Sequence, residues 1–154
     1  MQLTSSAFEH LGPMPSRHTC EGEDLSPPLA WSGAPDGTHS FVLIVDDPDA
    51  PDPAAPKRVW VHWVVYNLPP TLHAVPEGGP LPALARVGRN DSHQVRWDGP
   101  CPPIGRHRYF FKLYALDTTL PELRPPTKAA LEDAIRGHVL ASAELIGTYE
   151  KQRR

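Results

Sequence analysis

The chain has 154 residues, of which 40% are hydrophobic and 21% charged, and its formal net charge is −3 with the eight histidines neutral. This length fits one domain, residues 1–154, which buries roughly 68–70% of its unfolded surface, and the composition excludes a disordered chain. The charge balance argues against a nucleic-acid partner, because no basic run exceeds the terminal Arg153-Arg154.

No apolar run approaches the ~20 residues that a membrane-spanning helix needs, so no transmembrane segment is expected. The N-terminus has neither the basic nor the apolar region of a secretion signal, which favours a cytoplasmic location. Cys20 and Cys101 are too few for a disulfide framework and lack metal-ligand spacing. In a reducing cytosol two reduced or half-buried thiols are favoured, and a bridge between their Pro-rich loops is the open alternative.

Short apolar runs between prolines predict a mainly β protein. A first strand is expected over Gln2–Phe8, followed by a loop. The run Leu25–Trp31 contains two prolines, which confine it to a sheet edge or an irregular extended piece. Phe41–Val45 is continuously apolar, the pattern of a strand that is covered on both faces.

The segment Asp46–Lys57 holds four prolines and is predicted to be a stiff loop. Val59–Tyr66 follows as a strand with one polar interruption, His62. Residues 71–100 are expected to be mostly loop, of a length that is usually functional or packed on itself. Strict alternation along Val59–Tyr66 gives one face a defined set of side chains: Trp60, His62, Val64 and Tyr66.

The last third of the chain predicts a long strand, one helix and a short strand. In the strand over residues 107–116, His107 and Tyr109 share a face, while Arg108 points away with Arg106 as a surface charge. Thr127 is the expected N-cap of the helix, and residues 144–150 read as the last strand. The helix has an apolar stripe formed by Ala130, Leu131, Ala134 and Ile135, and Gly137 ends it.

Two acids, two histidines and a phenol can converge on one pocket at a sheet edge. Asp47 follows the Phe41–Val45 strand, and His62, His107 and Tyr109 lie on neighbouring strands. A phosphate group carries about −1.5 to −2 charge, and an imidazole beside a carboxylate can become the matching donor. Asp47 is expected to serve His62 or His107, and phosphate binding is expected to weaken as pH rises through the histidine pKa.

Three motifs in this order resemble the phosphatidylethanolamine-binding protein family. They are Asp47-Pro48-Asp49-Ala50-Pro51, Trp60-Val61-His62-Trp63, and Gly99–Pro103 leading to His107-Arg108-Tyr109. Leu25–Leu29 and the form of Gly99–Pro103 resemble its bacterial, Raf kinase inhibitor-like branch. The resemblance covers residues 5–150, and it implies a central antiparallel sheet packed on a smaller one, with an anion-binding pocket near one end.

The resemblance also implies roles for individual residues. Asp47, His62, His107 and Tyr109 match the acid, histidines and tyrosine of the family pocket, and Pro102-Pro103 match its wall. Two further residues have supporting roles. Asp49 is expected to fix its loop more than to touch the ligand, and Trp60 to line the cavity.

The predicted function is that of a non-catalytic binding protein for a phosphate-like or phosphoethanolamine-type group, with a regulatory role toward a kinase or protease. It uses no cofactor or metal and acts as a monomer or homodimer. The alternative is a small hydrolase or metal-dependent enzyme at the same pocket, in which His62 and His107 act as acid and base or as ligands with Asp47. The remaining histidines are expected to be solvated: His10, His18, His39, His73, His93 and His138.

Overall fold

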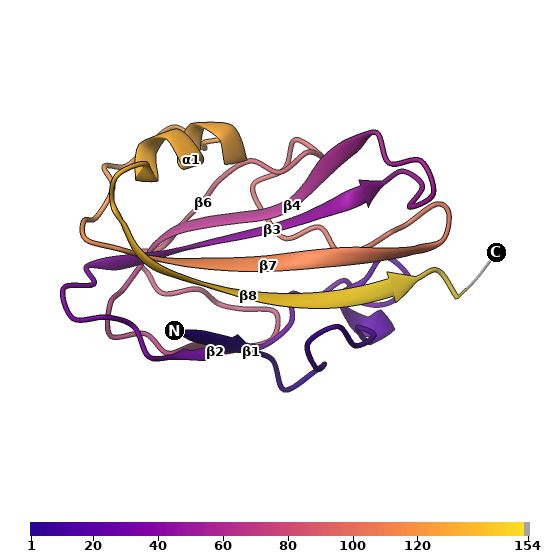
Figure 1. Cartoon of the computed structure of the whole chain (residues 1–154), viewed down its shortest axis with the longest axis horizontal. Coiled ribbons are helices and arrows are strands. Elements are labelled where there is room, and N and C mark those ends of the chain that lie inside the picture. The colour runs from indigo at the N-terminus through magenta and orange to yellow at the C-terminus, as the bar shows by residue number, and fades with distance from the viewer. Residues whose placement is uncertain (153–154) are drawn as a thin grey trace.

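The computed structural model describes residues 1–152, which form two antiparallel sheets and one α-helix. The larger sheet has the order β6-β4-β3-β7-β8 and the smaller has the order β1-β2-β5. The larger sheet consists of β3 (Ser40–Ala50), β4 (Arg58–Leu68), β6 (Arg86–Val87), β7 (Arg106–Leu116) and β8 (Val139–Glu150). The other elements are β1 (Gln2–Thr4), η1 (Ser16–His18), β2 (Leu29–Ser32), β5 (Ala74–Val75) and α1 (Lys128–Ile135). Figure 1 shows α1 on one face of the larger sheet, and β1 and β2 on the other. The expected mainly β fold with a central sheet, a smaller sheet and one helix toward the C-terminus is confirmed.

Strand β3 lies in the middle of the larger sheet, and its apolar run is covered on both faces, as predicted. The odd-numbered residues of Phe41–Val45 pack into the core between the two sheets. The even-numbered ones pack into a second core beneath α1, with Leu131 and Ile135. Because fully burying one such side chain contributes about 1.5–3 kcal/mol, this strand joins the three layers.

Strand β3 is longer than its sequence predicts, since it continues to Ala50 through the segment that was expected to be loop. Asp47 still pairs with Trp60, and Ala50 pairs with Arg58. The register shifts between Asp47 and Ala50, so Pro48, which has no N–H to donate, lies where the ladder is interrupted. The proline-rich loop therefore starts at residue 51, and both acids of the motif are held in a strand.

Two other predicted bounds are wrong, and so is the edge position predicted for the strand within residues 25–31, although residues 25–28 are irregular, as the alternative expected. Strand β1 ends at Thr4, and β8 begins at Val139, because it pairs with β7 along its whole length. Strand β2 is the middle strand of the smaller sheet and not an edge. Its two prolines, Pro27 and Pro28, precede the strand and remove no ladder hydrogen bond.

The helix follows its sequence signals closely. Thr127 Oγ1 accepts a hydrogen bond from the backbone N–H of Ala130 at 3.2 Å, which caps α1. Leu131 and Ile135 are buried against the sheet, whereas Ala130 is exposed. Gly137 follows the helix with φ +83°. Within residues 1–152, no helix has the length and apolarity that crossing a bilayer requires.

Candidate functional site

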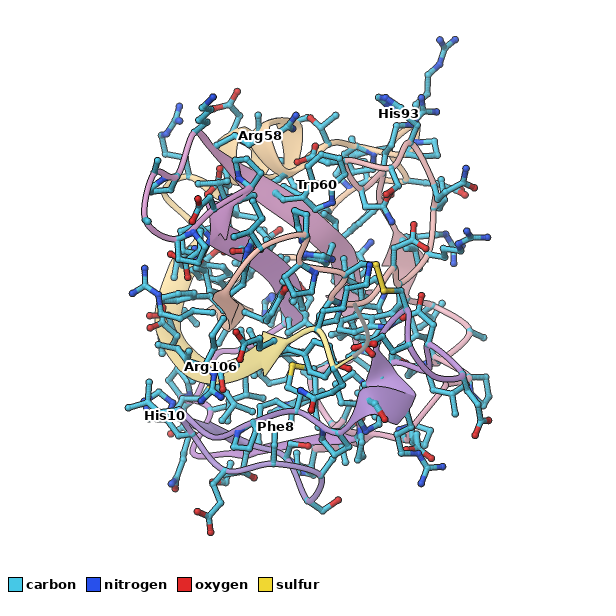
Figure 2. The ribbon with its side chains drawn as sticks, turned by 90° about the vertical axis from the view of Figure 1, so that its right-hand side faces the viewer. Phe8, His10, Arg58, Trp60, His93 and Arg106 are labelled. Atoms are coloured by element: carbon cyan, nitrogen blue, oxygen red, sulfur yellow. A yellow bond between two sulfur atoms is a disulfide. The ribbon has the colours of Figure 1, made fainter. Side chains whose placement is uncertain are left out.

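A pocket of about 290 Å³ opens at the end of the two-sheet sandwich where β3 and β8 finish and β7 begins. Figure 2 looks onto this end and shows Arg58 and Trp60 on one side of it, with Arg106 on the other. The structure brings seven of the predicted site residues to this pocket: Asp47, Trp60, His62, Pro102, Pro103, His107 and Tyr109. Six more lining residues were not predicted as site residues: Ala50, Pro51, Ser92, Asp98, Gly99 and Cys101.

Strand β7 supplies His107 and Tyr109 from one face, as alternation predicts. Both are buried, with 1% of each residue exposed. The Tyr109 ring stacks with the His107 ring at a centroid distance of 6.4 Å. Its other neighbour is the His62 ring, which it meets edge-on at 5.2 Å. The phenol thus lies between the two histidines.

Strand β4 does not keep the alternation that its sequence predicts. On β3, Val45 pairs with Trp63, yet the next residue, Asp46, pairs with Val61. One extra β4 residue, His62, therefore lies opposite this step, which is the definition of a β-bulge.

The bulge changes the face on which His62 lies. Val61 and Val64 both pack into the core beneath α1. Trp63 packs between the sheets, and its neighbour His62 contacts Tyr109 on that same side. The expected common face of His62 with Val64 and Tyr66 is wrong, because a single inserted residue reverses the alternation.

Asp47 and His107 form a buried pair. The His107 Nδ1 lies 2.6 Å from Asp47 Oδ2, and His107 Nε2 lies 2.9 Å from the Ile104 carbonyl and 3.1 Å from that of Pro51. All three partners are acceptors, so both ring nitrogens carry hydrogens and the ring is an imidazolium. The other Asp47 oxygen accepts from the Asp49 N–H at 2.7 Å. Asp47 thus serves His107, and the pair holds two walls of the pocket.

Asp49 turns away from the cavity and fixes its own segment, in keeping with the supporting role predicted for it. It accepts from the Arg108 backbone N–H at 2.9 Å and from two guanidinium nitrogens at 2.9 and 3.0 Å. These hydrogen bonds lower the pKa of Asp49 below its ordinary value. Arg108 is half exposed, as expected for a surface charge, but it is also the partner of this acid.

His62 is held by one nitrogen and presents the other to the cavity. Its Nδ1 lies 2.6 Å from the Asp98 carbonyl oxygen, which can only accept, so Nδ1 carries the hydrogen. Burial lowers the pKa of His62, and this outweighs the opposing effects of the Asp98 carbonyl and of the Asp47 carboxylate. The ring is therefore neutral and Nε2 bears a lone pair. This differs from the protonated donor that the sequence predicts.

The Tyr109 hydroxyl is buried and has no hydrogen-bond partner within the described chain. Burial, and then the negative charges of Asp47 and Asp49, raise the pKa of Tyr109 far above its ordinary value. The group therefore keeps its hydrogen at every physiological pH. A buried hydroxyl without a partner costs about 1–3 kcal/mol, so this hydroxyl marks a place where a ligand atom would be favourable.

The wall formed by residues 98–103 is tied to the loop after η1. Cys20 and Cys101 form a disulfide with a Cα–Cα distance of 5.4 Å, so the predicted reduced thiols are wrong and the open alternative is correct. Gly99 donates to Asp24 Oδ1 at 2.9 Å, and Cys20 donates to the Pro100 carbonyl at 3.1 Å. A Cβ at Gly99 would clash with Asp24 and with the His18 carbonyl. Both Cys residues lie in loops whose paths the sequence does not predict. No local pattern therefore indicated that the two residues are close together.

His18 is not solvated, contrary to its prediction. It is fully buried, and its Nδ1 donates to the Leu25 carbonyl at 2.9 Å. Its Nε2 faces Glu77 at 3.6 Å, away from the pocket. His18 therefore braces two loops behind the pocket wall and does not line the cavity.

Other parts of the surface offer less chemistry. A larger hollow of about 640 Å³ lies between β1 and β8, and its titratable side chains are Glu9, His10 and Glu144. Among the described residues no group of three or more His, Cys, Asp or Glu side chains is arranged to hold a metal ion. The pocket around His62 and Tyr109 is thus the place where unpaired polar atoms converge.

Comparison with known proteins identifies relatives that span nearly the whole chain. The sequence model for the phosphatidylethanolamine-binding proteins matches residues 4–150. The chain belongs to this family. A UPF0098 protein from Methanothermobacter thermautotrophicus is 49% identical over 98% of this chain and 99% of the relative. A UPF0098 protein from Chlamydia muridarum is 45% identical over 98% of this chain and 99% of the relative.

Solved structures of the family share the fold. A phosphatidylethanolamine-binding protein homologue from Chlamydia trachomatis D/UW-3/CX has a TM-score of 0.92 at 44% identity, over 98% of this chain and 97% of that one. YbcL from E. coli, described as a member of the mammalian family, has a TM-score of 0.87 at 36% identity, over 98% of each chain. The predicted family resemblance is confirmed.

Proposed function

We propose that this protein binds a small phosphate-like group in the pocket and does not transform it. The observation that carries the proposal is the Tyr109 hydroxyl, which is buried without a partner beside the free Nε2 of His62. Two polar atoms of this kind inside a mostly apolar cavity are typical of a preformed ligand site. The size of about 290 Å³ suits a small head group.

The electrostatics of the pocket favour binding over acid–base chemistry. An acid–base mechanism with His62 and His107 needs a free nitrogen on each ring. Both His107 nitrogens are taken up by Asp47 and by two carbonyls that close the walls. His107 therefore acts as a fixed support whose positive charge is balanced by the Asp47 carboxylate, and of the two histidines only His62 has a free nitrogen for the ligand.

Isothermal titration with inorganic phosphate and with phosphoethanolamine tests this proposal. Wild-type protein is expected to show saturable one-site binding, with no phosphate release from phosphoethanolamine or p-nitrophenyl phosphate. His62→Asn keeps a donor near the Asp98 carbonyl but lacks Nε2, so binding should weaken. The matched control is His73→Asn, since His73 is exposed and outside the pocket. Absence of binding to wild type, or His62-dependent turnover, would overturn the proposal.

A further inference from the structure

The free lone pair of His62 restricts which anions the pocket can accept. Building on the proposed function, we infer that the site selects oxyanions that carry their own hydrogen-bond donor. Hydrogen phosphate, which retains a P–OH group at neutral pH, should be preferred over sulfate and over simple phosphodiesters, which have none. The distinction concerns a single hydrogen on the ligand and not its size or shape.

The inference follows from the hydrogen-bond inventory of the cavity. Asp47 and His107 are saturated by each other, by Asp49 and by wall carbonyls. Two buried atoms with fixed hydrogen-bonding roles therefore remain for the ligand, beside the exposed Ser92 hydroxyl, which can donate or accept. The Tyr109 hydroxyl donates to a ligand oxygen, and the His62 Nε2 accepts a hydrogen. A ligand oxygen without a hydrogen would place its lone pair against that of Nε2, which is repulsive.

An anion without a donor can still bind if His62 itself takes up a proton, and the groups around it decide how readily this happens. The carboxylates of Asp46, Asp47 and Asp98 favour the charged ring. The His107 imidazolium, stacked on Tyr109, opposes it. Burial of the His62 ring is the largest effect and also opposes it. Sulfate must therefore draw a proton from solvent, whereas hydrogen phosphate brings one.

Selection against an isosteric ligand that lacks a needed hydrogen can be large, because a buried polar atom is then left unpaired. A hydrogen bond that involves a charged group contributes about 1.5–3 kcal/mol, which corresponds to roughly 10- to 150-fold in affinity. Sulfate and phosphate have the same tetrahedral shape, so a preference between them isolates the hydrogen.

The experiment is titration calorimetry at pH 8 with inorganic phosphate and with sulfate, each in two buffers of different ionisation enthalpy. Phosphate is expected to bind at least about tenfold more tightly and to take up almost no proton. Sulfate is expected to take up close to one proton. Monomethyl phosphate, with a second pKa of about 6, is a dianion without a P–OH group at pH 8, so it should also bind with proton uptake, as sulfate does.

His62→Asn should remove the preference, so that phosphate and sulfate bind with similar affinity. The wild-type comparison does not depend on any variant folding correctly. Equal wild-type affinities with equal proton uptake for the two anions would overturn the selection while leaving the proposed function standing. Failure of both anions to bind would overturn both.

Discussion

Replacing Tyr109 by Phe separates a ligand contact from a structural one, because the hydroxyl forms no hydrogen bond within the described chain. The substitution retains the ring, and with it the packing against His62 and His107. Removing an unpaired buried polar group does not break a native interaction. The free energy of unfolding should therefore stay the same or rise, by at most about 1–3 kcal/mol.

Ligand binding should respond in the opposite direction. A hydroxyl that donates to an anion contributes about 1.5–3 kcal/mol, so the Tyr109→Phe variant should bind phosphate roughly 10- to 150-fold more weakly. Urea denaturation gives the first quantity and titration calorimetry the second. A variant with weaker binding and undiminished stability is the expected result.

Tyr66→Phe is the matched control. Tyr66 is equally buried, but it lies in the core beneath α1, and its hydroxyl donates to the Leu123 carbonyl and accepts from the Leu123 N–H. This variant should lose about 1–3 kcal/mol of stability and bind phosphate normally. The reasoning would be refuted if Tyr109→Phe were clearly destabilised while its phosphate affinity matched that of wild type.

Three further predictions concern stability measured by urea denaturation. The double replacement of Cys20 and Cys101 by Ser opens a link across 81 residues and should lower the free energy of unfolding by roughly 4 kcal/mol; an unchanged midpoint would contradict it. Asp47→Asn leaves the His107 imidazolium unpaired and should cost about 3–5 kcal/mol, and a cost near zero would mean that His107 is neutral. Because the folded pKa of His62 is lowered, the unfolded state binds more protons below pH ~6.5, so wild type should lose more stability than His62→Asn between pH 7 and 5; parallel losses would refute this.

Local patterns predicted those parts of the fold that depend on neighbouring residues. Alternation along β7 placed His107 and Tyr109 on one face, because this strand pairs regularly with β8 from Arg106 to Ala115. The cap at Thr127 was visible because its partner is three residues away. That the site residues lie together in one pocket was predicted from the family motifs, and not from alternation alone.

The rest depends on contacts between residues that are distant in sequence. The disulfide joins Cys20 to Cys101 through two loops whose paths no periodic pattern fixes. His18 is buried by the same loops, although a polar residue near prolines ordinarily indicates exposure. The tautomer of His62 is fixed by the carbonyl of Asp98, which reaches it from 36 positions away.

The extra residue in β4 changes, at His62, which positions of the strand face α1 and which face the other side of the sheet. Upstream of it, Trp60 lines the cavity while Val61 packs beneath α1, and downstream Trp63 packs between the sheets while Val64 packs beneath α1. A point substitution on either side leaves this alternation in place. A one-residue deletion at His62 would instead invert every upstream position at once, so this site should tolerate changes of chemistry far better than changes of length.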